Sequence, residues 1–267
     1  MRDWIVLHED RSRAESFGSQ AARYDRARPR YPAAVIADVL GPRPAGRRVL
    51  DVGCGTGIAA RLLGAAGALV LGVEVDARMA EVARSHGVEV EVATFESWES
   101  RGRLFERVVA AQAWHWIDPL VGPEKAAAVL EPGGSLQCVW NVGAFSVDLA
   151  ATIDPIYQEL APDIHESSVI HGASVGREGE GALRYEVERQ GIARCDLFEE
   201  PTFATYGWRQ PYRTAEWIEL LRTHSDHALL EEPVREELLA RVATAIEQRG
   251  GVFELEYQTL RLSALRR

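Results

Sequence analysis

Short apolar runs of strand length alternate with helically periodic stretches through the first half of the chain. The apolar runs lie at 48–53, 69–74, 88–93, 107–111 and 135–140, and the helical patterns lie at 57–66, 77–86 and 120–130. Strands that alternate with helices in this way build a parallel sheet with helices packed on both faces. The pattern therefore predicts an α/β fold with a doubly wound sheet.

The flanking segments are less regular. Residues 14–41 are predicted to form two helices, broken by prolines within 28–32. Beyond residue 141 the pattern predicts a helix at 147–160, a strand at 203–208, helices at 214–224 and 233–249, and an alternating strand at 253–262. We expect one domain over 1–267, comprising a helical cover (14–41), a cofactor-binding core (48–141), an inserted substrate lid (142–200) rich in glycine at 172–181, and a C-terminal completion of the sheet (201–267).

Three alternating glycines follow the first predicted strand. The predicted strand that contains Asp51 leads directly into Gly53, Gly55 and Gly57, and the next predicted strand ends at Glu74. Glycine allows a sharp turn and a close approach of the backbone to a ligand, while the following helix offers unpaired N–H groups. An acid at the end of the second strand is placed to accept hydrogen bonds from ribose hydroxyls. The segment predicts a nucleoside-binding βαβ unit, although the glycines could instead build only a tight turn.

The spacing argues against a dinucleotide. Ile58 stands where the third glycine of G-x-G-x-x-G would fall, and no Lys-Ser/Thr pair follows to make a phosphate loop. Asp51 would repel a pyrophosphate, but it suits a ligand with a positive group, such as the amino end of S-adenosylmethionine. A nicotinamide oxidoreductase is accordingly disfavoured.

At these residues the chain resembles the class I S-adenosylmethionine-dependent methyltransferases. The Asp51–Gly57 segment with Glu74 is similar to their cofactor signature, and 111–116 and 130–136 match in the expected order. The segment 17–32 is similar to the leading segment of a small-molecule subgroup that includes trans-aconitate methyltransferases. The resemblance covers roughly residues 15–141. It implies a Rossmann-like sheet of seven strands with the last strand antiparallel.

The resemblance also implies roles for particular side chains. Those expected to bind the cofactor are Tyr24, Arg28, Asp51, Gly53, Gly55, Gly57, Glu74, Val75, Met79, Phe95, Glu96, Ala111 and Gln112. Those expected to face the substrate are Tyr31, Trp116, Trp140 and Asn141. Simpler interpretations stay open for several of them: Met79 as helix core, Glu96 as the cap of a turn, Arg28 as a surface ion pair with Asp25, and Tyr31 as packing on the sheet edge.

His115 is the candidate catalytic residue. It follows the fourth strand and titrates near neutrality, so it could remove a proton from an acceptor. It could equally be a histidine hydrogen-bonded between Trp114 and Trp116 that serves for positioning only. The aromatic rings of Tyr24, Trp114, Trp116 and Trp140 could face the sulfonium, or two of the four could belong to the core.

Further along the chain, Trp217, Leu220, Leu221 and His224 share one face of a predicted helix, which favours core packing over a substrate wall. His165 and His171 lack the spacing of a metal site, so no metal is assigned. Cys54, Cys138 and Cys195 are far apart and odd in number, and suggest neither a disulfide framework nor a zinc site.

Composition restricts the partners. The formal net charge of −10 argues against nonspecific nucleic-acid binding, and the absence of a signal-like leader or a long apolar run favours a cytoplasmic protein away from the membrane. A homodimer stays open. We expect S-adenosylmethionine-dependent methyl transfer to a small molecule by in-line displacement, without a metal. The alternative is a protein that binds S-adenosylmethionine or S-adenosylhomocysteine without catalysis.

Overall fold

The structure is a computed structural model that describes residues 17–167 and 185–267. The whole glycine-rich stretch of the predicted lid, at 172–181, lies outside these residues, as do His171 and the first residues of the predicted N-terminal helices.

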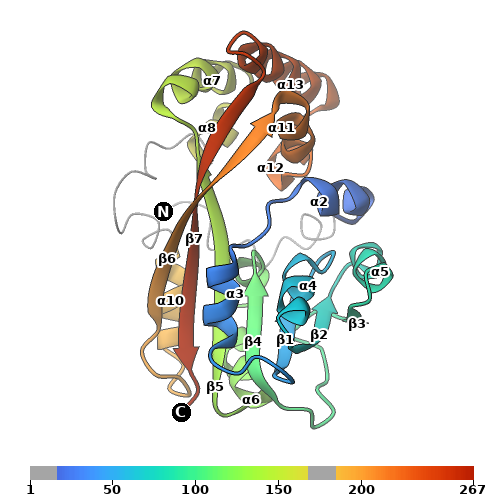
Figure 1. Cartoon of the computed structure of the whole chain (residues 1–267), viewed down its shortest axis with the longest axis vertical. Helices are drawn as coiled ribbons and strands as arrows, with labels where there is room; N and C mark the ends of the chain where they lie inside the picture. The colour runs from blue at the N-terminus through green and yellow to red at the C-terminus, as the bar shows by residue number, and fades with distance from the viewer. Residues whose placement is uncertain (1–16, 168–184) are drawn as a thin grey trace.

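A seven-stranded sheet organises the chain, in the order β3-β2-β1-β4-β5-β7-β6 (Figure 1). Its strands are β1 (Arg48–Val52), β2 (Leu69–Glu74), β3 (Glu89–Val92), β4 (Phe105–Ala111), β5 (Leu130–Ala144), β6 (Thr202–Arg213) and β7 (Val252–Leu265). Strands β1 to β5 pair in parallel, and β7 is antiparallel to both β5 and β6. The predicted doubly wound sheet with an antiparallel last strand is confirmed.

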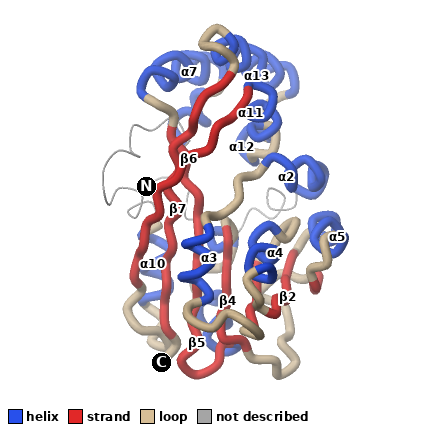
Figure 2. The backbone as a smooth tube through the Cα atoms, viewed as in Figure 1, coloured by secondary structure: helices blue, strands red, loops and turns tan. Residues whose placement is uncertain are grey.

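Helices cover both faces of the sheet, and a further group of helices lies at its upper end (Figure 2). They are η2 (Phe17–Gln20), α2 (Ala21–Ala27), α3 (Ala33–Leu40), α4 (Ile58–Ala65), α5 (Ala77–Ser85), η3 (Trp114–Trp116), α6 (Val121–Val129), α7 (Val147–Leu160), α8 (Pro162–Ser167), α10 (Glu186–Ala193), α11 (Thr214–Leu221), α12 (Ser225–Ala228) and α13 (Glu232–Glu247).

The two faces of the sheet have separate cores because successive side chains of a strand point to opposite faces. On one face, Val49 of β1 packs against α3, whose buried residues include Val39. On the other face, Leu50 of β1 belongs to a larger core that also takes in Val129 of α6 and Ile192 of α10. Helices therefore cover both faces of the sheet, so a site is expected at the ends of the strands.

Strands β5, β6 and β7 are longer than the rest and extend beyond the parallel strands into a second helical layer (Figure 1). There α7, α11 and α13 build another core, with the Trp217 side chain at 1% exposure near its centre. Leu220 and Leu221 belong to the same core, so the predicted core face of this helix is confirmed. His224 lies beyond the end of α11, and its inclusion on that helical face was wrong.

Element boundaries differ most after residue 130. The fifth strand, predicted at 135–140, spans Leu130–Ala144, so the first three residues of the expected 142–200 insertion belong to the sheet. The sixth strand, predicted at 203–208, continues to Arg213. Helix α10 was not predicted from the sequence, and Ile192 within it is fully buried in the main core. Short, partly charged segments of this kind acquire their order from tertiary packing.

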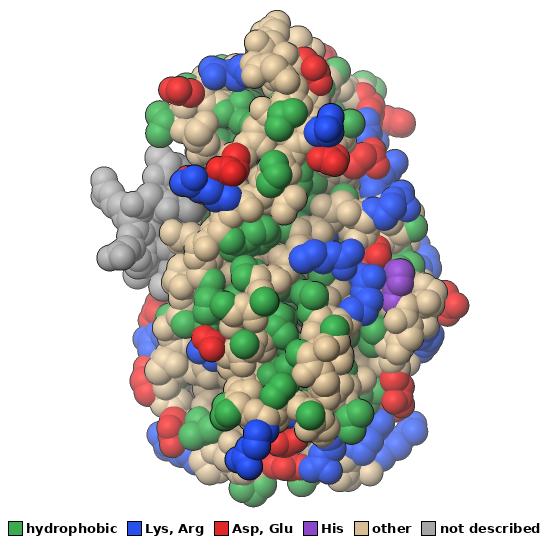
Figure 3. Space-filling model, viewed as in Figure 1, with side chains coloured by type: hydrophobic (Ala, Val, Ile, Leu, Met, Phe, Trp, Pro, Cys, Tyr) green, Lys and Arg blue, Asp and Glu red, His purple; other side chains and the backbone are tan. Residues whose placement is uncertain are grey.

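Figure 3 shows the charged and hydrophobic side chains on one face of the molecule. On the face seen in Figure 3, acidic and basic side chains are interspersed towards both ends, with hydrophobic side chains gathered between them. The charge of −10 is therefore not gathered on this face.

Candidate functional site

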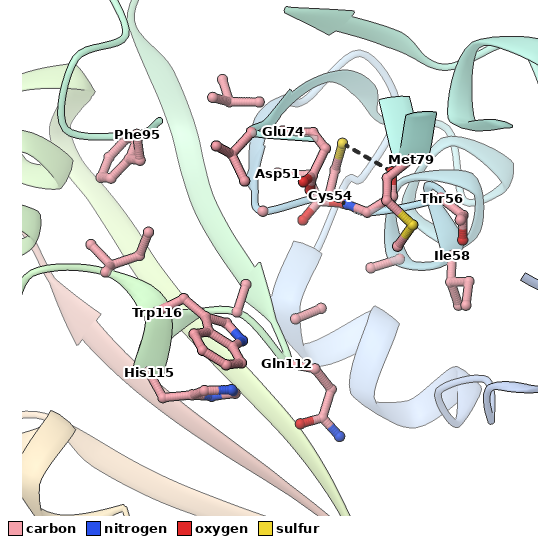
Figure 4. Close-up of a pocket in the computed structure, with 18 of the residues that line it drawn as sticks. Asp51, Cys54, Thr56, Ile58, Glu74, Met79, Phe95, Gln112, His115 and Trp116 are labelled. Atoms are coloured by element: carbon pink, nitrogen blue, oxygen red, sulfur yellow. Dashed lines mark hydrogen bonds between the residues drawn. The ribbon is translucent and has the colours of Figure 1, made fainter. Parts of the chain in front are cut away.

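A cavity of about 270 Å³ lies at the carboxyl ends of the parallel strands, where ligands bind in open α/β sheets (Figure 4). Nearly all of the predicted site residues line it. They are Tyr24, Arg28, Tyr31, Asp51, Gly53, Gly55, Glu74, Val75, Met79, Phe95, Glu96, Ala111, Gln112, His115, Trp116 and Asn141. Gly57 and Trp140 do not line it.

In the glycine loop between β1 and α4, the backbone packs closely against neighbouring residues. Gly53, Gly55 and Gly57 all have positive φ, at 63°, 56° and 80°. A Cβ on Gly53 would lie 2.6 Å from the Cβ of Ala113, and one on Gly57 would lie 3.2 Å from the Cβ of Ala83. Gly57 thus serves as the left-handed cap of α4, behind the cavity wall. The loop needs glycine for its conformation and for its packing.

Asp51 contributes a buried carboxylate to the site. Its side chain is fully buried at the end of β1, and neither carboxylate oxygen has a hydrogen-bond partner among the described residues. Burial, with the nearby charge of Glu74 added, raises the pKa of Asp51 to about 7. A buried carboxylate is costly unless it is paired, so this position favours a ligand that brings a positive group.

Glu74 is held by the backbone on both carboxylate oxygens. Oε2 accepts a hydrogen bond of 2.8 Å from the N–H of Gly55, and Oε1 accepts one of 3.0 Å from the N–H of Asp76. Burial raises the pKa of Glu74. The carboxylate is therefore oriented beside the glycine loop, with lone pairs left for hydroxyl groups of a ligand.

The wall formed by β2, β3 and the following loops is mainly apolar. Met79 and Phe95 are 4% and 2% exposed and both reach the cavity. Glu96 does not cap the turn that follows it, because its Oε1 accepts a hydrogen bond of 3.0 Å from the N–H of Asp118. It therefore ties the loop after β3 to the loop after η3.

The N-terminal segment forms one wall of the cavity through Tyr24, Arg28 and Tyr31. The Arg28 guanidinium lies over the Tyr24 ring, 4.8 Å from its centroid, and Nη2 donates a hydrogen bond of 2.7 Å to the carbonyl of Thr223. Its buried Nε has no hydrogen-bond partner among the described residues. Tyr31 lines the same wall, and burial, together with Tyr24 and Asp51, raises its pKa well above the usual range.

Asp25 does not pair with Arg28, contrary to the simpler interpretation of that arginine. Its carboxylate pairs instead with Arg61 of α4 and, at 3.2 Å, with His86 after α5. Arg23, on the same helix α2, pairs with Glu219 of α11 at 2.9 Å. These ion pairs therefore connect helix α2 both to the sheet layer and to the second helical layer.

The ends of β4 and β5 meet on the far side of the cavity. Gln112 has a positive φ of 57°, and its side-chain amide donates to the carbonyl of Asn141 at 3.0 Å. Asn141 in turn donates to the carbonyl of Arg30 at 3.2 Å and accepts from the hydroxyl of Thr259 on β7 at 2.6 Å. Both amides are thereby held in fixed orientations.

Two of the four candidate aromatic residues belong to the core. Trp114 and Trp140 are 3% and 0% exposed and lie in the main hydrophobic core, whereas Tyr24 and Trp116 reach the cavity. The prediction that Trp140 faces the substrate was wrong, because β5 turns this side chain towards the core face, where it stacks on Tyr185 at 4.2 Å. It remains in contact with the site through His115, since its Nε1 donates to His115 Nδ1 at 3.3 Å.

Some lining residues were not predicted as site residues. Thr56 has a buried Oγ1 with no partner among the described residues, and Ser225 reaches the cavity from α12. Its position between Gly55 and Gly57 could have identified Thr56 as a site residue from the sequence. Ser225 carries no local signal, because only the fold brings residue 225 to the cavity.

Among the described residues, one cluster has the donor types of a metal site, namely His224, Asp226 and His227. Asp226 accepts from the ring of His227 at 2.8 Å, and the Tyr157 hydroxyl bonds the other ring nitrogen at 2.8 Å. Both nitrogens of His227 are therefore engaged in a Tyr-His-Asp chain. Over the same described residues, no helix is long and apolar enough to cross a membrane.

The chain is similar in sequence to known methyltransferases. Over 128 residues the chain is 41% identical to an uncharacterized methyltransferase of Mycobacterium tuberculosis, a match covering 47% of this chain and 52% of the relative. A ubiquinone biosynthesis O-methyltransferase of Dinoroseobacter shibae is 33% identical over 109 residues, or 38% and 44% of the two chains. The chain thus matches about half the length of these curated relatives.

A solved structure has the same fold. It is a putative type II methyltransferase from Anaeromyxobacter dehalogenans, with a TM-score of 0.64, 20% identity, and coverage of 88% of this chain and 97% of that one. A family model described as a methyltransferase domain matches residues 24–192, which include the glycine loop, Glu74 and His115. By that match, the chain belongs to the methyltransferase-domain family.

Proposed function

We propose that this protein transfers the methyl group of S-adenosylmethionine to a small-molecule acceptor by in-line displacement. The observation that carries the proposal is the pair of buried carboxylates at the glycine loop. Neither carboxylate oxygen of Asp51 has a hydrogen-bond partner in the part of the chain that the structure describes, and Glu74 is oriented by two backbone N–H groups. A ligand with an ammonium group and ribose hydroxyls would satisfy both.

The cavity fits this cofactor in its other parts as well. Gly53 and Gly55 let the backbone form the cavity wall, and Met79 and Phe95 offer apolar surface for an adenine ring. Arg28, whose Nε has no hydrogen-bond partner over residues 17–167 and 185–267, could bind a carboxylate through charge-assisted hydrogen bonds. The bound cofactor would supply an electrophilic methyl carbon on a sulfonium, so the protein has chiefly to align the acceptor and exclude water.

The acceptor side of the cavity is mainly aromatic and neutral. Tyr31, Gln112, Trp116 and Asn141 line it. Among the described lining residues, Arg28 is the only arginine, so the clustered arginines expected for a multiply charged acid are not seen there. This composition favours an acceptor with an aromatic or weakly charged body.

The test is calorimetric titration with S-adenosylmethionine, S-adenosylhomocysteine and NAD. We expect micromolar binding of the first two and none of NAD. Asp51→Ala and Glu74→Ala should lose that binding, whereas the exposed acid Glu99 provides a matched control variant, Glu99→Ala. Binding of NAD alone, or of none of the three, would contradict the proposal.

Turnover separates catalysis from binding alone. Production of S-adenosylhomocysteine should be measured against a panel of carboxylic acids, phenols and amines. Binding with no turnover across the panel would favour the alternative of a non-catalytic binding protein.

A further inference from the structure

Two side-chain amides lie next to each other on one wall of the cavity. Gln112 and Asn141 are both half-buried and both line the cavity. They are in direct contact, because the amide of Gln112 donates a hydrogen bond of 3.0 Å to the backbone carbonyl of Asn141. In Figure 4 Gln112 lies on the side of Trp116, opposite Glu74. The two amides therefore belong to the part of the cavity that we propose for the acceptor molecule.

A backbone carbonyl fixes which end of the Gln112 amide faces it. A carbonyl oxygen only accepts hydrogen bonds, whereas an amide side chain donates through nitrogen and accepts through oxygen. Nε2 must therefore face the carbonyl of Asn141, since the opposite orientation would set two oxygens against each other. Oε1 is directed elsewhere, and it accepts no hydrogen bond from any residue within 17–167 or 185–267. Gln112 thus keeps an oxygen available to a ligand.

Hydrogen bonds across three neighbouring strands fix the Asn141 amide in the opposite sense. Nδ2 of Asn141 donates to the carbonyl of Arg30 at 3.2 Å, and Oδ1 accepts from the hydroxyl of Thr259 at 2.6 Å. The indole of Trp208 can only donate, and it donates to the same hydroxyl at 2.9 Å, so the hydroxyl uses its own hydrogen for Asn141. The second N–H of Nδ2 has no acceptor among the residues that the structure describes.

We propose that Asn141 and Gln112 form a donor and acceptor pair that recognises a neutral hydroxyl group of the acceptor molecule. The oxygen of the hydroxyl accepts from Asn141 Nδ2, and its hydrogen is donated to Gln112 Oε1. The inference deepens the proposed function and rests on it for the presence of an acceptor molecule. The orientation of the two amides follows from the protein alone. The pair recognises the hydroxyl, and no step of the methyl transfer is assigned to it.

The pair discriminates among the acceptor classes that the sequence left open. A carboxylate only accepts hydrogen bonds, so one of its oxygens would be set against Oε1 of Gln112. An ammonium group only donates, so it would be set against the N–H of Asn141. A polar atom that loses its partner in a half-buried wall weakens binding. A hydroxyl satisfies both amides with a single atom, which favours phenols and alcohols over acids and charged amines.

The two hydrogens of the Asn141 amide provide a direct test in the full chain. Asn141 is the sole asparagine of the sequence, so selective ¹⁵N labelling of asparagine gives one side-chain NH2 in a nuclear magnetic resonance spectrum. Its two hydrogens give separate signals, because the amide C–N bond has partial double-bond character. We expect the hydrogen bonded to Arg30 to exchange slowly with solvent and the other to exchange fast. Equal exchange rates would overturn the inference.

Phenol, anisole and benzoate test the recognition itself. The three share a ring, but phenol donates and accepts, whereas anisole and benzoate only accept. Each is titrated at millimolar concentration into the protein alone and into the protein with S-adenosylhomocysteine. We expect phenol to bind about tenfold more tightly than the other two and to shift the fast-exchanging hydrogen of Asn141. Equal binding of the three probes, or no binding of phenol, would overturn the inference.

Gln112→Met tests the accepting half of the pair. It removes Oε1 at similar side-chain length, and Gln248→Met, at an exposed position, is the matched control. We expect the preference for phenol over anisole to disappear in Gln112→Met and to persist in Gln248→Met. A preference that survives in Gln112→Met would refute the role of Gln112.

Thr259 is the positioning residue for the donating half, because its hydroxyl holds the amide of Asn141. The side chain is fully buried, so Thr259→Val removes the hydroxyl at nearly constant shape, and Thr259→Ser restores it. We expect Thr259→Val to weaken phenol binding about tenfold and to bring the exchange rates of the two Asn141 hydrogens together, and Thr259→Ser to behave like the unmodified protein. Unchanged exchange rates in Thr259→Val would refute this role. Should Thr259→Val fail to fold, the labelled unmodified protein and Gln112→Met still decide the inference.

The same titrations separate this inference from the proposed function. If S-adenosylhomocysteine does not bind, the proposed function fails, whereas phenol binding and the exchange rates in the protein alone still test the amide pair. If S-adenosylhomocysteine binds and phenol is not preferred, the inference alone fails.

Discussion

Oε2 of Glu74 accepts a 2.8 Å hydrogen bond from the backbone N–H of Gly55, across 19 positions of sequence. The acid that ends β2 is thus bound to the middle glycine of the loop that follows β1. Glu74 therefore orients the loop in addition to facing the cavity. Two residues that were singled out separately in the sequence form one structural unit.

Glu74→Gln should weaken binding of S-adenosylhomocysteine by about ten- to a hundredfold, because an amide cannot accept hydrogen bonds at both terminal atoms. One of the two N–H groups, of Gly55 or Asp76, would then face an NH2 group. Calorimetry measures the change, with Glu99→Gln as the control. Unaltered affinity in Glu74→Gln would show that the carboxylate does not bind ligand.

The raised pKa of Asp51 predicts that ligand binding depends on pH. Its pKa of about 7 in the free protein means that it is mostly protonated below pH 7, whereas a cationic ligand needs the carboxylate. Affinity for S-adenosylmethionine should rise about tenfold per pH unit up to 7 and then level off. Titrations between pH 5.5 and 8.5, in buffers of different ionisation enthalpy, should reveal the released proton. A flat profile would contradict this assignment.

The same carboxyl affects folding with the opposite trend. Its pKa is raised on folding from the ordinary value near 3.8, so its contribution to stability is complete below that value and is lost as the pH rises towards 7. The loss is on the order of a few kcal/mol. Urea unfolding of the ligand-free protein should show Asp51→Asn gaining stability over the unmodified protein at pH 8, and little difference at pH 4. Equal pH dependence in both proteins would contradict this.

Gly53 and Gly46 form a matched pair for testing the loop. Both have positive φ, at 63° and 76°, but a Cβ on Gly46 would meet nothing within 4 Å, whereas one on Gly53 would collide with Ala113. Gly46→Ala should cost about 1 kcal/mol of unfolding free energy, and Gly53→Ala about 2 to 4 kcal/mol with loss of ligand binding. Similar costs for the two variants would mean that conformation alone, not the close approach, selects glycine at Gly53.

Arg28→Met should weaken binding of S-adenosylhomocysteine by about ten- to a hundredfold, since it removes a guanidinium whose buried Nε has no hydrogen-bond partner within the described residues. Arg26, exposed on the same helix, supplies the control Arg26→Met. Unfolding measurements on both variants separate lost binding from lost stability. Equal affinity in the two variants would leave Arg28 a purely structural role, as a donor to the carbonyl of Thr223.

Local patterns predicted the parts of the site that are built locally. The alternating glycines and the acids Asp51 and Glu74 lie at the ends of predicted strands. Because the carboxyl ends of parallel strands lie along the same side of a sheet, the strand pattern predicts that these residues come together. The fate of Trp140 could not be predicted in this way. The face to which a central strand turns each side chain depends on register, and a strand buried on both faces has no polar alternation to reveal it.

Contacts between distant segments also lay beyond the sequence. Ser225 reaches the cavity, and Arg28 bonds the carbonyl of Thr223, only because α2 packs between the sheet and the upper helices. Nothing near either residue in the sequence signals that partner. Long β6 and β7 were underestimated for the same reason, because their outer halves are ordered by pairing with each other and by the second core.

The pairing of β5 with β7 bears on the order in which this protein can be built. Asn141, on β5, is fixed by Thr259, which is synthesised 118 residues later. During translation one edge of β5 therefore stays without its partner while those residues are added, and an open apolar strand edge invites pairing with other chains. The wall of the cavity that carries Asn141 is thus completed late in synthesis, long after the residues of the glycine loop have been added.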